Sequence, residues 1–124
     1  MEFPALRGRS ILVVEDEPLI GMHIRTALEE AGAFVTQTTT VRHALILIEH
    51  DGLAGAIMDH GLSDGNSMEL CARLKARGIP YVSYSGYDPV KGASPDAPHV
   101  SKPAPMDTLL SALEALLPRW PRIS

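Results

Sequence analysis

Acidic, hydroxyl and amino side chains stand at the ends of four apolar runs of the sequence. Glu15 and Asp16 follow the first of these runs, and Asp59 follows a later one. Two further runs end at Ser85 and just before Lys102. Runs of this kind read as buried strands, and in a parallel α/β sheet all strands end at the same edge, where such proteins bind ligands. We therefore expect these five residues to gather at one edge of a sheet.

Three carboxylates at one point repel one another and need a cation. Oxygen ligands held in loops at the edge of a sheet suit Mg²⁺ or Mn²⁺ better than zinc, and the backbone carbonyl of Gly61 would complete the shell. Ser85 and Lys102 would face the same point from the other side. A carboxylate surrounded by a metal, a lysine and a hydroxyl is the set needed to form an aspartyl phosphate, with the aspartate as nucleophile.

Alternating strand and helix patterns position these residues. Short apolar or β-branched runs predict strands, and apolar residues at helical spacing predict the segments between them. The expected strands cover residues 11–14, 34–38, 56–58, 81–85 and 99–101. The expected helices cover 18–31, 41–48, 68–77 and 109–117, with Thr40 and Ser67 as the N-terminal caps of the second and third. The alternation favours a doubly wound, flavodoxin-like α/β fold: a five-stranded parallel sheet of order 2-1-3-4-5 with helices on both faces.

One segment interrupts this alternation. Residues 88–98 contain Pro89, Pro95 and Pro98 together with Gly92. Proline removes a backbone donor and clashes with the preceding turn, so no uninterrupted window here is long enough for an ordinary helix. The sequence therefore predicts a loop, with the fourth helix of the fold short or missing.

The length and composition suit a single compact domain over residues 1–124, with a core at about 10–117 and no output domain. The net charge of -4 and the scattered basic residues argue against binding to nucleic acid. Cys71 is the only cysteine, which excludes an internal disulfide. Neither a signal peptide nor a run long enough to span a membrane is evident, so we expect a cytoplasmic protein.

With these features the sequence resembles the response-regulator receiver domains of two-component signalling, from Ile11 to about Leu117. The run Tyr84-Ser85-Gly86-Tyr87 further resembles a subgroup with a Phe-Ala-Thr-Gly-Tyr-type motif. The motifs that carry the family resemblance are Val14-Glu15-Asp16-Glu17-Pro18, Met58-Asp59, Ser85-Gly86 and Lys102-Pro103.

The resemblance implies a role for each site residue. Asp59 would be the phosphoacceptor, and Asp16 and Asp59 would bind Mg²⁺ directly together with the Gly61 carbonyl. Glu15 would act on the metal through water.

Ser85 takes the place of the family's switch hydroxyl, and Lys102 that of the lysine that holds the phosphoryl group. The sequence departs from the family at two positions. His99 stands where many receivers carry a rotating Tyr or Phe, and Ser63 replaces a common proline.

The resemblance implies a phosphoacceptor rather than an enzyme, with slow autodephosphorylation at most. A sensor histidine kinase or a histidine phosphotransfer protein would be the donor, and a downstream protein would read the phosphorylated state. We expect a monomer or weak dimer. The alternatives are a receiver-like interaction module that works without phosphorylation, and a phosphate sink.

Two other classes of protein fit the sequence less well. A haloacid-dehalogenase-like phosphatase requires Asp-x-Asp after its strand, where this chain has Asp59-His60-Gly61. A flavodoxin-type flavin carrier would bind phosphate after the first strand, where Glu15, Asp16 and Glu17 repel it.

Overall fold

The computed structural model describes residues 3–50, 52–59, 67–85 and 97–117, with Ser85 described by its backbone. Five parallel strands form one sheet in the order β2-β1-β3-β4-β5, which confirms the predicted topology. The strands are β1 (Ser10–Val14), β2 (Phe34–Thr38), β3 (Leu53–Met58), β4 (Tyr81–Ser85) and β5 (His99–Ser101).

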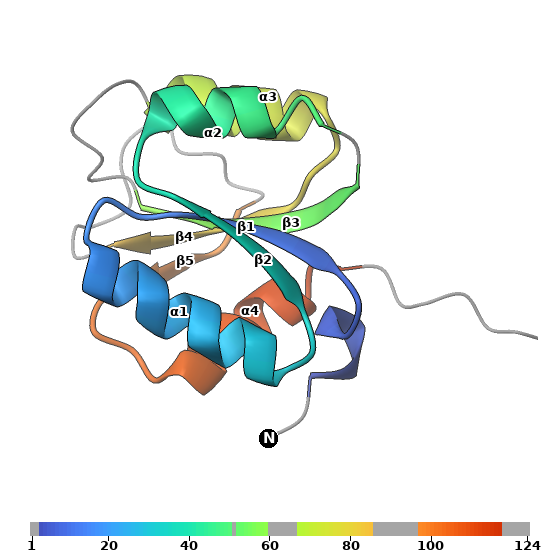
Figure 1. Ribbon diagram of the computed structural model, residues 1–124, viewed down its shortest axis with the longest axis vertical. Coiled ribbons are helices and arrows are strands. Elements are labelled where there is room, and N and C mark those ends of the chain that lie inside the picture. The colour runs from blue at the N-terminus through green and yellow to red at the C-terminus, as the bar shows by residue number, and fades with distance from the viewer. Residues whose placement is uncertain (1–2, 51, 60–66, 86–96, 118–124) are drawn as a thin grey trace, which may run out of the picture.

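Helices cover both faces of this sheet, as predicted. Figure 1 shows α1 and α4 on one face and α2 and α3 on the other. Among the described residues, no helix combines the length and apolar character needed to cross a membrane. The helices are α1 (Pro18–Glu30), α2 (Val41–Leu47), α3 (Ser67–Ala76) and α4 (Met106–Glu114).

The central strand β1 is apolar after its first residue, Ser10, because both of its faces are covered. Ile11 and Val13 belong to the core beneath α1 and α4, whereas Leu12 and Val14 belong to the core beneath α2 and α3. Successive side chains of a strand point to opposite faces, so a strand packed on both sides has no position left for a polar residue. This packing fixes the strand that leads to Glu15.

Local signals in the sequence set the helix ends. The hydroxyl of Thr40 accepts a hydrogen bond of 3.1 Å from the backbone N–H of His43 and so caps α2, as predicted. Gly32 follows α1 with a φ of 93°, a conformation that favours glycine. Ser67, which we expected to cap the next helix, is instead the first residue of α3. Helix bounds of this kind are commonly uncertain by one or two residues from sequence.

The N-terminal segment belongs to the core, which the sequence analysis did not predict. Pro4–Leu6 form a 3₁₀ helix, and Phe3 and Leu6 are buried in the core that α1 and α4 cover. The backbone N–H of Ala5 donates a 2.9 Å hydrogen bond to Oε2 of Glu114, which fixes the segment to α4. The core therefore begins well before residue 10.

The proline-rich segment between β4 and β5 falls mainly outside the described residues. Only Ala97 and Pro98 of residues 88–98 are described, so the absence of a regular helix there stays a prediction. The helix that follows β5 is the one predicted over 109–117, and it begins three residues earlier, at Met106.

Candidate functional site

The register between β1 and β3 places two acidic residues side by side. Val14 pairs with Met58, and the backbone N–H of Asp59 donates to the carbonyl of Val14 at 3.0 Å. The backbone N–H of Glu15 is held in turn by the carbonyl of Thr38, also at 3.0 Å. Glu15 and Asp59 are 2% and 7% exposed. Two buried carboxyl groups therefore meet at the carboxyl edge of the sheet.

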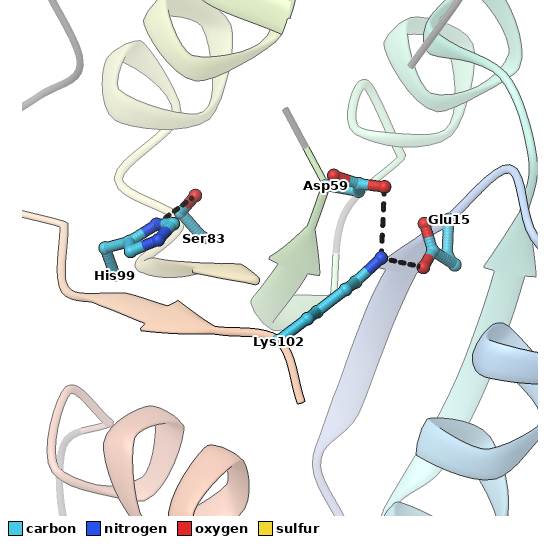
Figure 2. A network of polar contacts seen from close by, with 5 residues as sticks. All are labelled: Glu15, Asp59, Ser83, His99 and Lys102. Carbon is cyan, nitrogen blue, oxygen red and sulfur yellow. Dashed lines mark hydrogen bonds and ion pairs between the residues drawn. The ribbon is translucent and has the colours of Figure 1, made fainter. Parts of the chain in front are cut away.

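Lys102 supplies the positive charge between them. Its side chain begins just after β5 and extends past the ends of β4 and β3 toward β1. Figure 2 shows its Nζ between the two carboxyl groups, donating to Oε1 of Glu15 at 2.5 Å and to Oδ2 of Asp59 at 3.2 Å. The same Nζ lies 5.4 Å from the ring centroid of Tyr84 on β4, within the range of a cation–π contact.

Burial and mutual repulsion set the protonation of this group. Burial and the neighbouring Asp59 together raise the pKa of Glu15 to about 7, against the opposing effect of Lys102. Burial on its own would lower the pKa of Lys102, but its hydrogen bonds and charge interactions with Glu15 and Asp59 outweigh this, and the pKa is raised. Near neutral pH the lysine is charged and Glu15 is only partly ionised.

Asp16 adds a third carboxyl group to the pair. One oxygen from each of Glu15, Asp16 and Asp59 lies within 4.8 Å of the others, close enough to hold one metal ion. Oε2 of Glu15 is buried with no hydrogen-bond partner in the part of the chain that the structure describes. A buried oxygen atom destabilises the fold unless a hydrogen-bond donor or an ion binds it. An all-oxygen set with a free buried oxygen fits Mg²⁺ or Mn²⁺ and does not favour zinc.

The structure thus brings together Glu15, Asp16, Asp59 and Lys102, as expected from the strand ends. The backbone of Ser85 ends β4, next to Ser101 at the end of β5. Its hydroxyl and the Gly61 carbonyl lie outside what the structure describes, and their roles stay predictions. His60 and Ser63 lie outside it as well.

The sequence analysis missed the partner of His99. Ser83 on β4 is opposite His99 on β5, and its hydroxyl lies 3.2 Å from Nδ1 of the imidazole (Figure 2). Ser83 is buried, and Nε2 of His99 is buried without a partner among the described residues. A serine inside an apolar strand was the available signal, because a buried hydroxyl requires a hydrogen-bonding neighbour.

Known proteins are similar to this chain in sequence and in fold. No protein-family model matches the chain. SdrG from Sphingomonas melonis Fr1 is 39% identical, its solution structure superimposes with a TM-score of 0.74, and the match covers 90% of this chain and 97% of SdrG. A response regulator receiver protein from Sinorhizobium medicae superimposes with a TM-score of 0.81 at 21% identity, over 90% of this chain and 95% of that one. This chain belongs to the response-regulator receiver family.

A curated relative agrees with this assignment. The transcriptional regulatory protein TcrA of Mycobacterium tuberculosis is 32% identical over 126 residues. The match covers 92% of this chain but only 48% of TcrA, so the chain spans about half the length of that relative. Receivers are phosphate acceptors that bind a divalent cation in an acidic pocket and interact with histidine kinases and downstream targets. The subgroup motif rests partly on Gly86 and Tyr87, which lie outside the described residues.

Proposed function

We propose that this receiver accepts a phosphoryl group on Asp59 from a histidine kinase or a histidine phosphotransfer protein, in a Mg²⁺-dependent reaction. The observation that carries the proposal is the position of Lys102, whose ammonium contacts both Asp59 and Glu15. A receiver-like domain that is never phosphorylated would gain little stability from burying two carboxyl groups around one cation, since the cost of desolvation offsets much of the attraction. A phosphoryl-transfer site needs this arrangement of a nucleophile with fixed positive charge beside it.

The chemistry follows from these groups. An oxygen of the Asp59 carboxylate attacks phosphorus, the P–N bond to the donor imidazole breaks, and its electron pair returns to the imidazole nitrogen. The product is an aspartyl phosphate. Lys102 stabilises the charge that develops on the phosphoryl oxygens, because its ammonium is already held at the nucleophile.

Glu15, Asp16 and Asp59 would hold the Mg²⁺ ion, with the Gly61 carbonyl as a further ligand. The unpartnered Oε2 of Glu15 supports this assignment, since it offers a buried acceptor on the acidic cluster. When bound, the metal neutralises the phosphoryl oxygens during transfer. Mn²⁺ has the same preference for oxygen ligands and would serve as a substitute.

Output through a protein partner is also part of the proposal. The charge of -4 and the scattered Lys and Arg residues favour a protein surface over nucleic acid as the target of residues 1–124. The name of TcrA describes a transcriptional regulator, but this chain matches only about half of that protein. We place the domain in the cytoplasm, as a monomer or weak dimer.

Phosphorylation by a small donor tests the proposal. Incubation with acetyl phosphate and Mg²⁺ is expected to add one phosphoryl group by intact-mass analysis, and EDTA is expected to prevent it. Asp59→Asn is expected to remain unlabelled, whereas Asp107→Asn, at an exposed aspartate on α4, controls for loss of a carboxylate and is expected to label like the parent. Equal labelling of Asp59→Asn would contradict the assignment. A parent that stays unlabelled would favour the phosphorylation-independent module.

A further inference from the structure

A groove lies between α1 and α4, away from the acidic cluster. It encloses about 400 Å³, and its walls carry the apolar side chains of Phe3, Ala27, Met106 and Leu110. The volume is within the range of about 300–1,000 Å³ that is typical of ligand pockets. The groove therefore has room for a large apolar side chain.

The rim of this groove is acidic. Glu30 on α1 and Asp107 on α4 both line it, and neither Lys nor Arg is among its lining residues. Both carboxylates are exposed, and neither forms an ion pair or side-chain hydrogen bond with another described residue. Apolar walls with an acidic rim fit a segment that carries a large apolar residue flanked by positive charge.

The chain itself contains such a segment directly after the described residues. Residues 118–122 read Pro-Arg-Trp-Pro-Arg, with two positive charges around the only tryptophan of the protein and no acidic residue. The two prolines disfavour a continuation of α4 and favour an extended backbone.

The distance suits this segment as well. Leu117 is the last described residue, and Leu110 in the groove precedes it by seven positions. α4 covers the first four of these positions and turns cover the rest, so about 10 Å separate the two residues along the helix direction. An extended chain covers about 3.3 Å per residue, so the three residues from Leu117 to Trp120 span about 10 Å. Trp120 can therefore return to the level of Leu110 when the chain turns back directly after Leu117.

We propose that residues 118–122 fold back onto their own domain, with Trp120 in the α1–α4 groove and Arg119 and Arg122 beside Glu30 and Asp107. A partner that binds the α1–α4 face has to displace the segment first.

Fluorescence of the single tryptophan tests the proposal. In dilute parent protein, Trp120 is expected to emit at shorter wavelength and to be quenched less by acrylamide than in a synthetic peptide of residues 116–124. Glu30→Lys with Asp107→Lys is expected to shift the emission toward that of the peptide and to raise the quenching. Arg119→Glu with Arg122→Glu, which changes only the proposed docking segment, is expected to do the same.

Two controls make the outcome specific. Glu69→Lys reverses an exposed charge on α3, on the opposite face of the sheet, and is expected to leave the fluorescence unchanged. Combining the lysine and glutamate substitutions exchanges the charges and is expected to restore the parent signal. A parent tryptophan as exposed as that of the peptide would overturn the proposal. A blue shift that disappears on dilution would also overturn it, because the segment would then bind a second copy of the chain.

Discussion

The Nζ atom of Lys102 lies 2.5 Å from Oε1 of Glu15, although 87 positions separate the two residues in the sequence. The contact joins the end of β5 to the end of β1 and passes Asp59 on the way. It makes the lysine the counter-ion of the acidic pair. A divalent cation bound to the same carboxylates would also neutralise their charge. We therefore expect the loss of Lys102 to change how much the metal stabilises the fold, and bound metal to change how much Lys102 stabilises it.

Lys102→Ala is expected to lower the stability of the metal-free protein. The substitution leaves two buried carboxyl groups without their cation, and since the lysine is partly exposed we expect a loss on the order of 2 kcal/mol, below the cost of breaking a fully buried pair. Mg²⁺ is expected to raise the melting temperature of this variant more than that of the parent, because no ammonium competes for the carboxylates. Thermal melts in EDTA and in Mg²⁺ measure both effects. Lys75→Ala, at an exposed lysine of α3, is the control.

Glu15 is expected to give the metal-free protein a distinctive pH dependence. Its folded pKa of about 7 lies above the unfolded value near 4.5, so the folded state holds the extra proton. The proton on Glu15 therefore adds on the order of 3 kcal/mol at most to the free energy of unfolding. This contribution is complete below about pH 4.5 and is lost as the pH rises through 7.

Glu15→Gln is expected to remove this component. Urea unfolding of parent and variant in EDTA at several pH values gives the difference in their free energies of unfolding, and Glu69→Gln controls for the chemical change. If the free energies of unfolding of the parent and Glu15→Gln changed with pH in parallel, the pKa of Glu15 would not be raised in the folded state.

Asp59→Asn is expected to be more stable than the parent near pH 7 without metal. One charge is removed from a cluster in which like charges repel, and a gain on the order of 1 kcal/mol corresponds to about one pKa unit of interaction. Saturating Mg²⁺ is expected to shrink or reverse the difference, because the parent keeps all its metal ligands and is stabilised more by binding. Melts of both proteins in EDTA and in Mg²⁺ measure it. A less stable variant in EDTA together with a parent that ignores Mg²⁺ would contradict the convergence of the carboxylates.

The order of the sheet and the meeting of the acidic residues could be predicted because both follow from simple rules. Apolar runs such as residues 11–14 mark strands with both faces covered, and the carboxyl ends of parallel strands share one edge. Asp59 and Glu15 therefore had to lie close together once β1 and β3 were neighbours.

Other features depend on tertiary contacts that no local pattern encodes. The burial of Phe3 and the bond from Ala5 to Glu114 join segments more than 100 residues apart. The pairing of Ser83 with His99 depends on the register between β4 and β5, which the sequence does not give. The raised pKa of Glu15 likewise requires knowledge of its burial, which only the packed structure provides.

Chemical mapping of the phosphoryl group tests the central claim most directly. The protein would be phosphorylated with acetyl phosphate and Mg²⁺ and then treated with sodium borohydride, which reduces an aspartyl phosphate to homoserine and releases phosphate. Peptide mass spectrometry then locates the reduced residue among the aspartates of the chain. We expect homoserine at position 59 and at no other position. Homoserine at a different aspartate, or a labelled protein whose position 59 remains aspartate, would contradict it.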